Sequence, residues 1–590
     1  MGKPKILVGL GSCGIAAGGQ AIYDHLKQTV PADLADIEIT SCIGMCWAEP
    51  LVEVVGTAGG TERTLFGYVD PAFSDQIWQG LQAGKLPDEK RVRESQDGKD
   101  YLEKQVKVVL RNCGVINPEK IEDYLATGGY EALKKCLNEY TPQQVIDIVK
   151  ESGLAGRGGA FFPTATKWGL FAANPAPEGG HKYLVCNADE GDPGAFMDRA
   201  TIEGDPHGLL EGMLIAAYAT GADRGYVYCR AEYPLAIKRL KRAIEEAEKR
   251  GFLGEDIMGK DFAFHLKIKE GAGAFVCGEE TALMASIMGR RGMPTLKPPF
   301  PAVSGLFESP TNINNVETFE NVAYIINRGP AEFNKYESNG TIGTKVFALA
   351  GKVKRAGLVE IPVGMTIREL VEHIGGGSST GLPLKAVQMG GPSGGCIPER
   401  LFDMTIDVKS VTGTGAIMGS GGFIVMDEQT CMVDVAQYFL TFVQSESCGK
   451  CTFCRIGTKR MLEILHRITA GKGEAQDLDR LQELAAAIKK SSLCALGQLA
   501  PNPVLTTLKY FPEEYEEHIR EKKCRAKVCK PLIKYAILAD TCTGCGACLR
   551  GCPVKAISGE KRKPHTIDAD KCTRCGLCKD TCKFAAIDVF

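Results

Sequence analysis

Two stretches near the carboxyl end carry the pattern that decides the fold there: CTGCGACLRGCP at residues 542–553 and CTRCGLCKDTCK at residues 572–583. Each stretch spaces four cysteines as C-x2-C-x2-C-x3-C. In this spacing three thiolates bind one 4Fe-4S cluster and the fourth binds the neighbouring cluster. We therefore expect residues 536–590 to form a two-cluster ferredoxin domain, built from two copies of one unit.

The ferredoxin spacing also predicts which cysteines share a cluster. The ligands expected for the first cluster are Cys542, Cys545, Cys548 and the distal Cys582. The ligands expected for the second cluster are Cys572, Cys575, Cys578 and Cys552. Pro553 follows Cys552 as the motif requires, whereas Lys583 follows Cys582, which could change the local turn and the potential of the first cluster.

A third cysteine group lies upstream, where Cys448, Cys451 and Cys454 form C-x2-C-x2-C. Three ligands on one turn fit the corner of a cubane cluster better than the zinc site that four thiolates also favour. Cys494 lies beyond a predicted helical hairpin that can return the chain to this turn. We expect these four cysteines to bind a third 4Fe-4S cluster.

Four more soft ligands flank the predicted helical region. His518, Cys524 and Cys529 are spaced H-x5-C-x4-C, and Cys431 opens the region. Since Cys3His is a common closed zinc set, we expect a structural zinc that holds the tail at a fixed distance. The alternative is a solvated basic helix, because five lysines and arginines lie between residues 522 and 530.

Length and composition limit the remaining possibilities. A chain of 590 residues with 44% apolar residues can form several cores, and about 100 to 200 residues per domain predicts three to five domains. The formal net charge of -2 gives no reason to expect nucleic acid. Cysteines at ligand spacing in so long a chain fit a reducing cytoplasm, and without a long apolar run we expect no membrane insertion. Residues 10–13 resemble a lipoprotein cleavage box, but the apolar segment before them is too short for a signal peptide, so export is not expected.

Periodicity divides the chain into segments. Residues 1–85 predict a small α/β unit with strands at 5–8, 37–41 and 51–55 and a helix at 17–27, and residues 86–104 predict a polar linker. Residues 105–335 alternate strands with helices as an α/β sheet requires. Residues 336–428 predict a small α+β module, and residues 429–535 a helical bundle.

A glycine-rich loop, GRGGA at 156–160, allows backbone N–H groups to approach a phosphate, and Lys167 follows one short element later. Most such loops only turn the chain. Three later stretches make the combination specific: NADE at 187–190, GAGAFVCGEET at 271–281 and NINNVET at 312–318.

Together these stretches closely resemble the flavin- and NADH-binding subunit of respiratory complex I and its soluble relatives, over about residues 105–515. The resemblance implies an FMN- and NADH-binding α/β domain followed by a ubiquitin-like, soluble-ligand-binding β-grasp domain. The residues implied to hold FMN are Gly156, Arg157, Gly158, Lys167, Asn187, Asp189, Phe275, Gly278, Glu279, Asn314 and Asn315. Those implied to place NADH over it are Phe162, Glu190, Asp192, Glu280, Lys297 and Phe300. Hydride transfer needs alignment rather than a protein acid or base, so we expect no catalytic residue.

One position departs from the family pattern. Phe161 stands where the motif usually has a glycine, and its ring could alter the nicotinamide pocket. Phe161 and Phe162 could also exchange roles, and either ring could simply pack in a core.

The amino-terminal cysteines leave several interpretations open. Residues 9–14 match G-x-G-x-x-G after a strand, but we provisionally reject a dinucleotide fold. Cys13 with Cys42 and Cys46 resembles the thioredoxin-like 2Fe-2S domain of relatives of this family, which normally has four cysteines. Val8 stands where the partner of Cys13 would be. A cluster completed by Ser12, a cluster completed by an outside ligand, and no cluster all remain open.

Across almost its whole length the chain resembles the flavin subunit of soluble NAD-dependent hydrogenases and formate dehydrogenases, including electron-bifurcating ones. The resemblance implies an NADH dehydrogenase that passes single electrons from FMN through iron-sulfur clusters. Implied partners are a hydrogenase or formate dehydrogenase catalytic subunit, a small 2Fe-2S subunit and ferredoxin, since no hydrogenase active-site signature occurs in this chain. The alternatives are a non-bifurcating NADH dehydrogenase module and a wiring scaffold without flavin.

Overall fold

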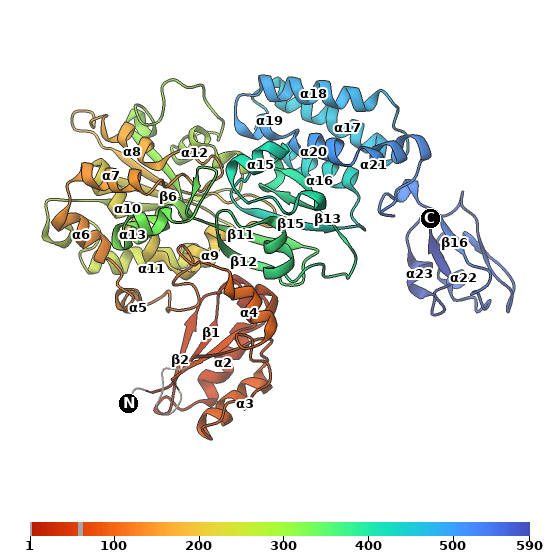
Figure 1. Cartoon of the computed structure of the whole chain (residues 1–590), viewed down its shortest axis with the longest axis horizontal. Coiled ribbons are helices and arrows are strands. Elements are labelled where there is room, and N and C mark those ends of the chain that lie inside the picture. The colour runs from red at the N-terminus through yellow and green to blue at the C-terminus, as the bar shows by residue number, and fades with distance from the viewer. Residues whose placement is uncertain (1–2, 57–62) are drawn as a thin grey trace.

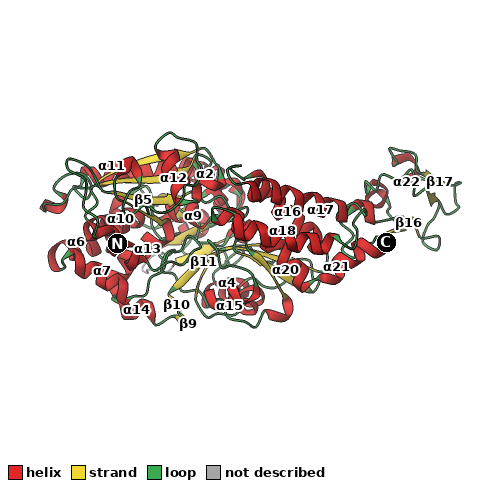
Figure 2. Cartoon of the chain, turned by 90° about the horizontal axis from the view of Figure 1, so that it is seen from above, coloured by secondary structure: helices red, strands yellow, loops and turns green. Residues whose placement is uncertain are grey.

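The computed structural model describes residues 3–56 and 63–590 (Figure 1). Two sheet-containing units and a helical bundle form the central body. The amino-terminal unit lies against one side of this body, and the carboxyl-terminal unit lies at its far end, beyond the bundle (Figures 1 and 2). The predicted multidomain α/β class is confirmed. Among the described residues, no helix is both long and apolar enough to cross a membrane.

The amino-terminal unit is a four-stranded mixed sheet in the order β2-β1-β3-β4. β1 pairs in parallel with β2 and antiparallel with β3. Ile22 and Leu26 of one helix pack with Phe73 and Ile77 of another in the core under this sheet. The elements are β1 (Lys5–Gly9), α1 (Ser12–Ala16), α2 (Gly19–Thr29), β2 (Asp36–Thr40), β3 (Val52–Val55), β4 (Arg63–Phe66) and α3 (Pro71–Gln82). The predicted strands and helix are present, and β4 and α3 complete the unit.

The segment expected as a polar linker is instead a structured joint. It contains helix α4 (Gln96–Glu103), and the side chain of Tyr101 is fully buried. The Tyr101 hydroxyl lies 2.7 Å from the carbonyl oxygen of Gly44 and 2.9 Å from that of Leu358. One aromatic ring in a polar stretch gives no periodic signal, which is why the sequence predicted a linker here.

The largest unit is built on a parallel sheet in the order β7-β6-β5-β8. Its strands are β5 (Tyr183–Ala188), β6 (Arg224–Arg230), β7 (His265–Gly271) and β8 (Thr311–Asn315). Because β8 lies on the opposite side of β5 from β6, the strand order reverses between β5 and β8. The carboxyl ends of strands at such a switch point are where open α/β sheets bind ligands.

Helices cover this sheet and bury its core. α10 (Pro206–Thr220) is apolar on almost every face and is nearly completely buried, as expected of a central helix. The strands predicted near residues 183 and 226 and the helix predicted near residue 235 are confirmed. The other helices are α5 (Ile121–Ala126), α6 (Glu131–Glu139), α7 (Pro142–Glu151), α8 (Thr164–Ala172), α9 (Met197–Gly204), α11 (Pro234–Lys249), α12 (Glu280–Ile287), α13 (Val316–Arg328) and α14 (Pro330–Asn334).

The next unit is a five-stranded sheet in the order β12-β11-β15-β13-β14. Its central strands β11 and β15 run in parallel, and the other pairs are antiparallel. The elements are β9 (Glu337–Ser338), β10 (Thr341–Ile342), β11 (Thr344–Gly351), β12 (Gly357–Pro362), the π-helical turn η5 (Glu369–Ile374), β13 (Leu384–Met389), β14 (Gly395–Pro398), α15 (Val408–Thr414) and β15 (Gly422–Asp427). The predicted α+β module is therefore confirmed.

A helical bundle follows, with Leu440, Met461, Leu465, Leu481 and Ile488 in its core. Its helices are α16 (Met432–Ser445), α17 (Thr458–Thr469), α18 (Asp477–Ser491), α19 (Ala495–Leu499), α20 (Asn502–Tyr510) and α21 (Pro512–Glu516). The helical hairpin predicted around residues 471–473 is present as α17 and α18.

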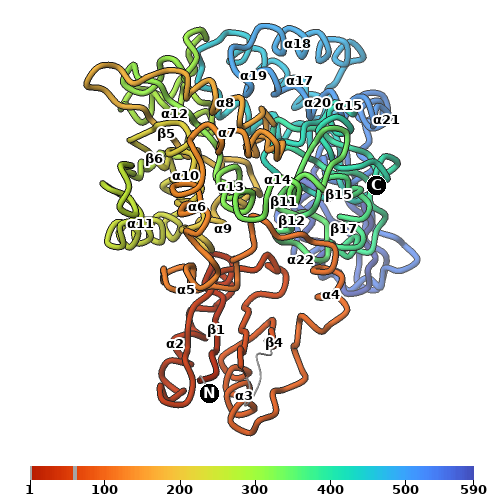
Figure 3. Tube along the Cα trace, turned by 60° about the vertical axis from the view of Figure 1, so that its left-hand side comes forward, coloured from red at the N-terminus to blue at the C-terminus, as the bar shows by residue number. Residues whose placement is uncertain are grey.

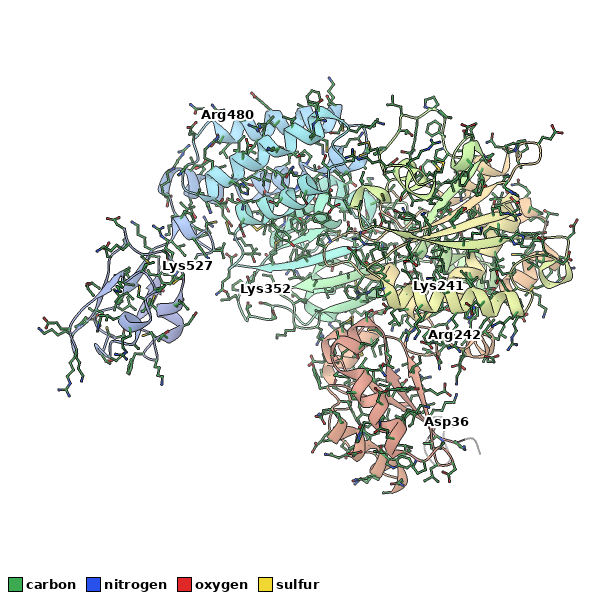
Figure 4. The ribbon with its side chains drawn as sticks, turned by 180° about the vertical axis from the view of Figure 1, so that it is seen from behind. Asp36, Lys241, Arg242, Lys352, Arg480 and Lys527 are labelled. Atoms are coloured by element: carbon green, nitrogen blue, oxygen red, sulfur yellow. The ribbon has the colours of Figure 1, made fainter. Side chains whose placement is uncertain are left out.

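The carboxyl-terminal unit repeats one strand and helix arrangement twice. The elements are β16 (Tyr535–Ile537), α22 (Ala547–Gly551), β17 (Ile557–Ser558), β18 (Thr566–Ile567), α23 (Leu577–Thr581) and β19 (Ile587–Val589). β16 pairs with β19 and β17 with β18, both antiparallel. Val589 packs into the bundle core. Lys527, in the segment that joins the two units (Figure 4), lies 3.9 Å from the Asp588 carboxylate.

Candidate functional site

The expected amide side chains meet at the switch point between β5 and β8. Asn187 and Asn315 are register partners on these strands. The Asn187 side-chain amide donates to the carbonyl oxygen of Gly278 at 2.9 Å. Asn315 caps α13 and donates to the Asp198 carboxylate at 2.6 Å. Asn314 is buried beside them and accepts a hydrogen bond from the Trp168 indole at 3.0 Å. Four segments distant in sequence are thus joined at one end of the sheet.

The glycine-rich loop lies directly beside these strands. The Gly156 amide donates to the Phe162 carbonyl at 2.8 Å, so the loop closes on itself. A side chain at Gly158 would place its Cβ 3.1 Å from the Asn315 Cβ, which leaves room only for glycine without adjustment. The buried Arg157 side chain turns inward and donates to the carbonyls of Ala155 (3.1 Å) and Ile342 (2.6 Å). The Arg157 backbone amide also donates to the Thr318 hydroxyl at 2.9 Å, so Arg157 shapes the loop through both its side chain and its backbone.

A cluster of charged side chains, Lys167, Glu280 and Lys297, forms the second part of the site. Lys167 donates to the Ile313 carbonyl at 2.6 Å and pairs with Glu280, and Lys297 lies 3.0 Å from Glu280. Burial alone would raise the pKa of Glu280, but the two ammonium groups hold it at about 2. Glu279 caps α12 by accepting from the amides of Thr281 and Ala282. The sequence-predicted residues 167, 279, 280 and 297 are thus brought together.

Asp189 is the least satisfied group of the site. It is buried, and neither carboxylate oxygen has a hydrogen-bond partner among the described residues. Burial raises its pKa to about 7, although the Arg230 guanidinium lies 3.8 Å away. A buried polar group without a partner requires a ligand or water. Hydroxyl and ring N–H donors of a flavin would supply this partner, so the residues present fit FMN.

Two of the acidic residues expected to contact NADH, Glu190 and Asp192, precede α9 in the chain, whereas the third, Glu280, begins α12. Glu190 accepts from the amides of Asp198 and Arg199, each at 3.1 Å, and so caps this helix. Asp192 accepts from the Ser420 hydroxyl, and burial raises its pKa to about 6. The Glu190 carboxylate is therefore already engaged in capping α9.

The expected aromatic residues differ in their surroundings. Phe162 is 51% exposed and Phe300 is 58% exposed. Phe161 is partly buried, and its ring centroid lies 5.6 Å from the Arg157 guanidinium carbon. The Phe161 φ of +51° lies in the left-handed region, which glycine adopts without strain. This explains why the family motif usually has a glycine where this chain has Phe161. Phe162, and not Phe161, is free to stack on a ligand.

The third cysteine group lies next to this site. Burial raises the pKa of Cys454 to about 11, assisted by the nearby thiols of Cys451, Cys494 and Cys448. A Cβ at Gly497, three residues after Cys494, would lie 3.1 Å from the Cys454 Cβ, so the chain returns to the cysteine turn after the α17–α18 hairpin. The Phe275 amide donates to the Glu446 carboxylate at 2.9 Å, and Lys450 donates to the Pro294 carbonyl at 2.5 Å. These contacts tie the cysteine turn to the loops of the parallel sheet.

The expected zinc ligands form a closed, buried group. The ligand atoms of Cys431, His518, Cys524 and Cys529 all lie within 4.8 Å of one another. The His518 Nε2 lies 3.4 Å from the Cys431 sulfur and 3.3 Å from the Cys529 sulfur. The His518 Nδ1 lies 2.7 Å from the Glu514 carbonyl, which orients the ring. Such a set suits tetrahedral zinc.

Each expected ferredoxin ligand set lines one cavity. Cys542, Cys545, Cys548 and Cys582 line one small pocket. Cys552, Cys572, Cys575 and Cys578 line another. The Ala556 amide donates to the Cys552 sulfur at 3.2 Å, and the Ala586 amide donates to the Cys582 sulfur at 3.4 Å. Each crossing ligand thus accepts a hydrogen bond from the backbone amide of the alanine four residues later.

The amino-terminal cysteines also come together. The Cys46 sulfur lies 3.7 Å from the Cys42 sulfur and 3.6 Å from the Cys13 sulfur. The neighbouring thiols, Cys42 first, and the Arg199 guanidinium hold the pKa of Cys13 well below its usual range. Ser12 donates to the Glu203 carboxylate of α9. α9 lies on the side of the central body that faces this unit (Figure 3).

Three functional side chains escaped the sequence analysis. Glu446 precedes the cysteine turn by only two residues, a proximity that could have marked it. Asp198 and Arg199 lie on one helix yet contact different sites, and only the fold brings them there. Nothing in their spacing distinguishes them from ordinary helix residues.

Comparison with known families matches these units. The Nuo51 FMN-binding domain matches residues 149–324 and the NADH-ubiquinone oxidoreductase-F iron-sulfur binding region matches residues 434–518. The SLBB domain matches residues 346–396 and a 4Fe-4S dicluster domain matches residues 541–586.

Relatives align over most of the chain. The NADP-reducing hydrogenase subunit HndC of Solidesulfovibrio fructosivorans is 56% identical over 462 residues, covering 78% of this chain and 93% of that protein. An NADH-quinone oxidoreductase F subunit of Rhizobium meliloti is 48% identical over 417 residues, covering 71% and 98%. A solved chain of an NAD+-reducing NiFe-hydrogenase in the H2-reduced state superposes with a TM-score of 0.63 at 30% identity, covering 88% of this chain and 84% of that one. The chain therefore belongs to the family of FMN- and iron-sulfur-dependent oxidoreductase subunits that includes the F subunits of NADH-quinone oxidoreductases and the hydrogenase subunit HndC.

Proposed function

We propose that this chain exchanges hydride with NAD(H) at FMN and passes the electrons singly into iron-sulfur clusters. One observation carries the proposal: the loop 271–279 belongs to both sites. At Gly278 it accepts from Asn187 of the flavin site, and at Phe275 it donates to Glu446 beside the cysteine turn. A flavin at the first site and a cluster at the second would therefore be neighbours.

The chain's own residues would do the positioning. Bound FMN supplies the exchange between a two-electron hydride donor and one-electron acceptors. The Asp189 carboxylate, without a partner in the described part of the chain, offers an acceptor for hydroxyl or ring N–H groups of FMN, and the glycine-rich loop at residues 156–160 lies beside the same strands. Phe162 and Phe300 offer exposed rings for nicotinamide or adenine. Lys297, three residues before Phe300, forms a charged pair with Glu280. Alignment, rather than proton transfer, is the protein's contribution.

We propose three 4Fe-4S clusters, on the ligand sets predicted from the spacing. The first uses Cys448, Cys451, Cys454 and Cys494. The other two use the crossed ferredoxin sets, supported by the two cavities that those sets line. Four clustered ligands also support one structural zinc on Cys431, His518, Cys524 and Cys529. The zinc would fix the ferredoxin unit to the bundle.

We further propose that the chain works in a cytoplasmic multisubunit complex that couples NADH and ferredoxin to hydrogenase or formate dehydrogenase chemistry on a partner subunit, with a small 2Fe-2S subunit. Its likeness to subunits named for hydrogenases supports the hydrogenase partner. The two-cluster tail supports a second electron route, to ferredoxin. A non-bifurcating NADH dehydrogenase module is the alternative, supported by the likeness to the F subunits of NADH-quinone oxidoreductases.

Rates measured with the purified complex distinguish the bifurcating complex from the non-bifurcating module. If electrons are bifurcated, NADH and ferredoxin react at full rate only when the third substrate is present. Full-rate oxidation of NADH without ferredoxin would favour the non-bifurcating module. A purified iron-rich protein without releasable flavin would contradict both and leave a wiring scaffold.

A further inference from the structure

The Cys46 thiol lies at metal-ligand spacing from each of the other two amino-terminal thiols. The two measured sulfur separations are 3.6 and 3.7 Å, from Cys46 to Cys13 and to Cys42. Thiolates at about 2.3 Å from a tetrahedral ion lie about 3.8 Å apart. The backbone amide of Gly44 donates to the Cys42 sulfur at 3.3 Å, as amides do beside metal thiolates. Cys46 is thus placed to share a metal centre with both other thiols, and a centre with four ligands needs one ligand more.

Ser12 cannot readily be that ligand. Its hydroxyl donates to one Glu203 carboxylate oxygen, and its amide donates to the other at 2.8 Å. Glu203 is nearly fully buried on α9, so this contact belongs to the junction between the two units. Binding a metal through Ser12 would break the contact and leave a buried carboxylate without its donors.

Glu49 is a buried carboxylate next to the turn that carries Cys13. Its side chain is only 9% exposed, and one carboxylate oxygen accepts from the Leu51 amide at 2.9 Å. That oxygen lies 3.1 Å from where a Cβ on Gly14 would stand, so the carboxylate lies under the turn that carries Cys13. The other oxygen, Oε1, has no hydrogen-bond partner within residues 3–56 and 63–590. A buried carboxylate left open beside three thiols requires a partner.

Basic groups around the site offset its charge. Three thiolates and a carboxylate remain negative even with a bound cation. The Arg199 guanidinium lies 3.9 Å from the Cys13 sulfur. Lys107, on the other side, donates to the Ile43 carbonyl at 2.9 Å, one residue from Cys42. The surroundings thus fit an anionic metal centre.

We propose that Glu49 is the fourth ligand of a metal centre whose other ligands are the thiolates of Cys13, Cys42 and Cys46. The same three-thiolate, one-carboxylate set could hold one iron-sulfur cluster or one zinc ion. The ligand set is argued independently of the proposed function. Only a redox role for this centre rests on the proposed electron path. Glu49 lies three residues beyond Cys46 and takes the place of the missing fourth cysteine.

The test compares metal and acid-labile sulfide per chain in the full-length protein and its variants. Glu49→Ala should reduce the metal held at this centre by at least about tenfold. Loss of iron with sulfide identifies an iron-sulfur cluster, and loss of zinc alone identifies a zinc ion; either supports the proposal. Glu49→Cys should restore the metal, with a visible or EPR spectrum typical of thiolate ligands alone.

Glu53→Gln is the matched control. Glu53 is a buried acid on the next strand that pairs with Arg63 and Arg93, so its loss perturbs the same unit without touching the thiols. Three results would overturn the proposal: Glu49→Ala keeps the wild-type metal content and spectrum, Glu53→Gln loses as much metal as Glu49→Ala, or Cys42→Ala loses none. NADH-driven ferricyanide reduction should persist in every variant; its absence from the wild type would count against the proposed flavin function instead.

Discussion

The backbone amide of Phe275 donates a 2.9 Å hydrogen bond to the Glu446 carboxylate. Phe275 belongs to the loop that Asn187 holds at the flavin site, and Glu446 ends helix α16 beside Cys448. The Phe275 ring also packs edge-on against Phe442 of α16, with centroids 5.4 Å apart. These two contacts, together with the Lys450–Pro294 hydrogen bond, set the position of the cysteine turn relative to the parallel sheet.

Glu446→Gln should weaken this link without removing any cofactor ligand. Because a hydrogen bond to a charged group contributes about 1.5–3 kcal/mol, we expect a lower melting temperature. Reduction of the Cys448 cluster by NADH should slow, while FMN content stays unchanged. Stopped-flow absorbance and flavin analysis measure both. Glu463→Gln, at a half-exposed pair on α17, should change neither. Equal rates in the Glu446→Gln and wild-type proteins would contradict this role of Glu446.

Asp189 should make the stability of the flavin-free protein depend on pH. Its native pKa of about 7 lies above the ordinary value of 3.8. The folded state therefore binds the extra proton, and stability is full at low pH and is lost as pH rises from about 4 through about 7. The loss is at most roughly 4 kcal/mol. Asp189→Asn should flatten the decline in urea unfolding between pH 5 and pH 8. If the free energy of unfolding of the Asp189→Asn variant falls with pH as steeply as that of the wild type, Asp189 is not the source of the pH dependence. The exposed Asp261→Asn change serves as control.

Phe162 and Phe161 should differ in their effect on NADH. Because Phe162 is half exposed and Phe161 packs against Arg157, only the Phe162 ring can stack on the ligand. An aromatic contact contributes about 0.5–1.5 kcal/mol beyond area, so Phe162→Ala should raise the KM for NADH up to about tenfold with little change in kcat. Phe161→Ala should change the KM less than Phe162→Ala does. Steady-state kinetics with ferricyanide would refute this assignment by showing the reverse order.

Phe161 also allows a test of backbone strain. At a φ of +51°, glycine is favoured over any residue with a Cβ. Phe161→Gly and Phe161→Ala both remove the ring, but only glycine removes the backbone strain. The glycine variant should therefore be more stable than the alanine variant by about 1 kcal/mol. Chemical unfolding of the two variants measures the difference. An alanine variant at least as stable as the glycine variant would show that the left-handed conformation is not populated.

His518→Ala should release zinc without affecting the flavin site. The ring is fully buried between two thiols, and no other described residue supplies the fourth ligand atom of that group. We expect loss of one zinc per chain and faster proteolysis between the bundle and the ferredoxin unit. His466→Ala, at an exposed position on α17, is the control. Retention of zinc by His518→Ala would exclude this site.

Patterns within short stretches predicted much of this molecule. The cysteine runs at 448–454, 542–552 and 572–582 needed only their spacing, and the helices of the bundle needed only their apolar period. Contacts between distant segments were not predictable: the inward turn of Arg157 depends on Ile342, and the burial of Tyr101 depends on Gly44 and Leu358. The carboxylate oxygen of Glu49 left unpartnered by the described residues indicates a ligand site only because the fold places Glu49 beside the turn that carries Cys13. Spacing predicts ligands that share a turn, whereas the fold alone decides which side chains from other segments complete a site.

Rapid reduction of the purified protein by NADH tests most directly whether electrons pass from flavin to cluster. Flavin absorbance at its visible bands and the broad iron-sulfur absorbance are followed together after mixing. We predict about one releasable FMN per chain, bleached first, with cluster absorbance falling afterwards in wild type and much less in Cys494→Ala. Cluster reduction without flavin, or flavin reduction that never reaches a cluster in the wild type, would contradict that electron path.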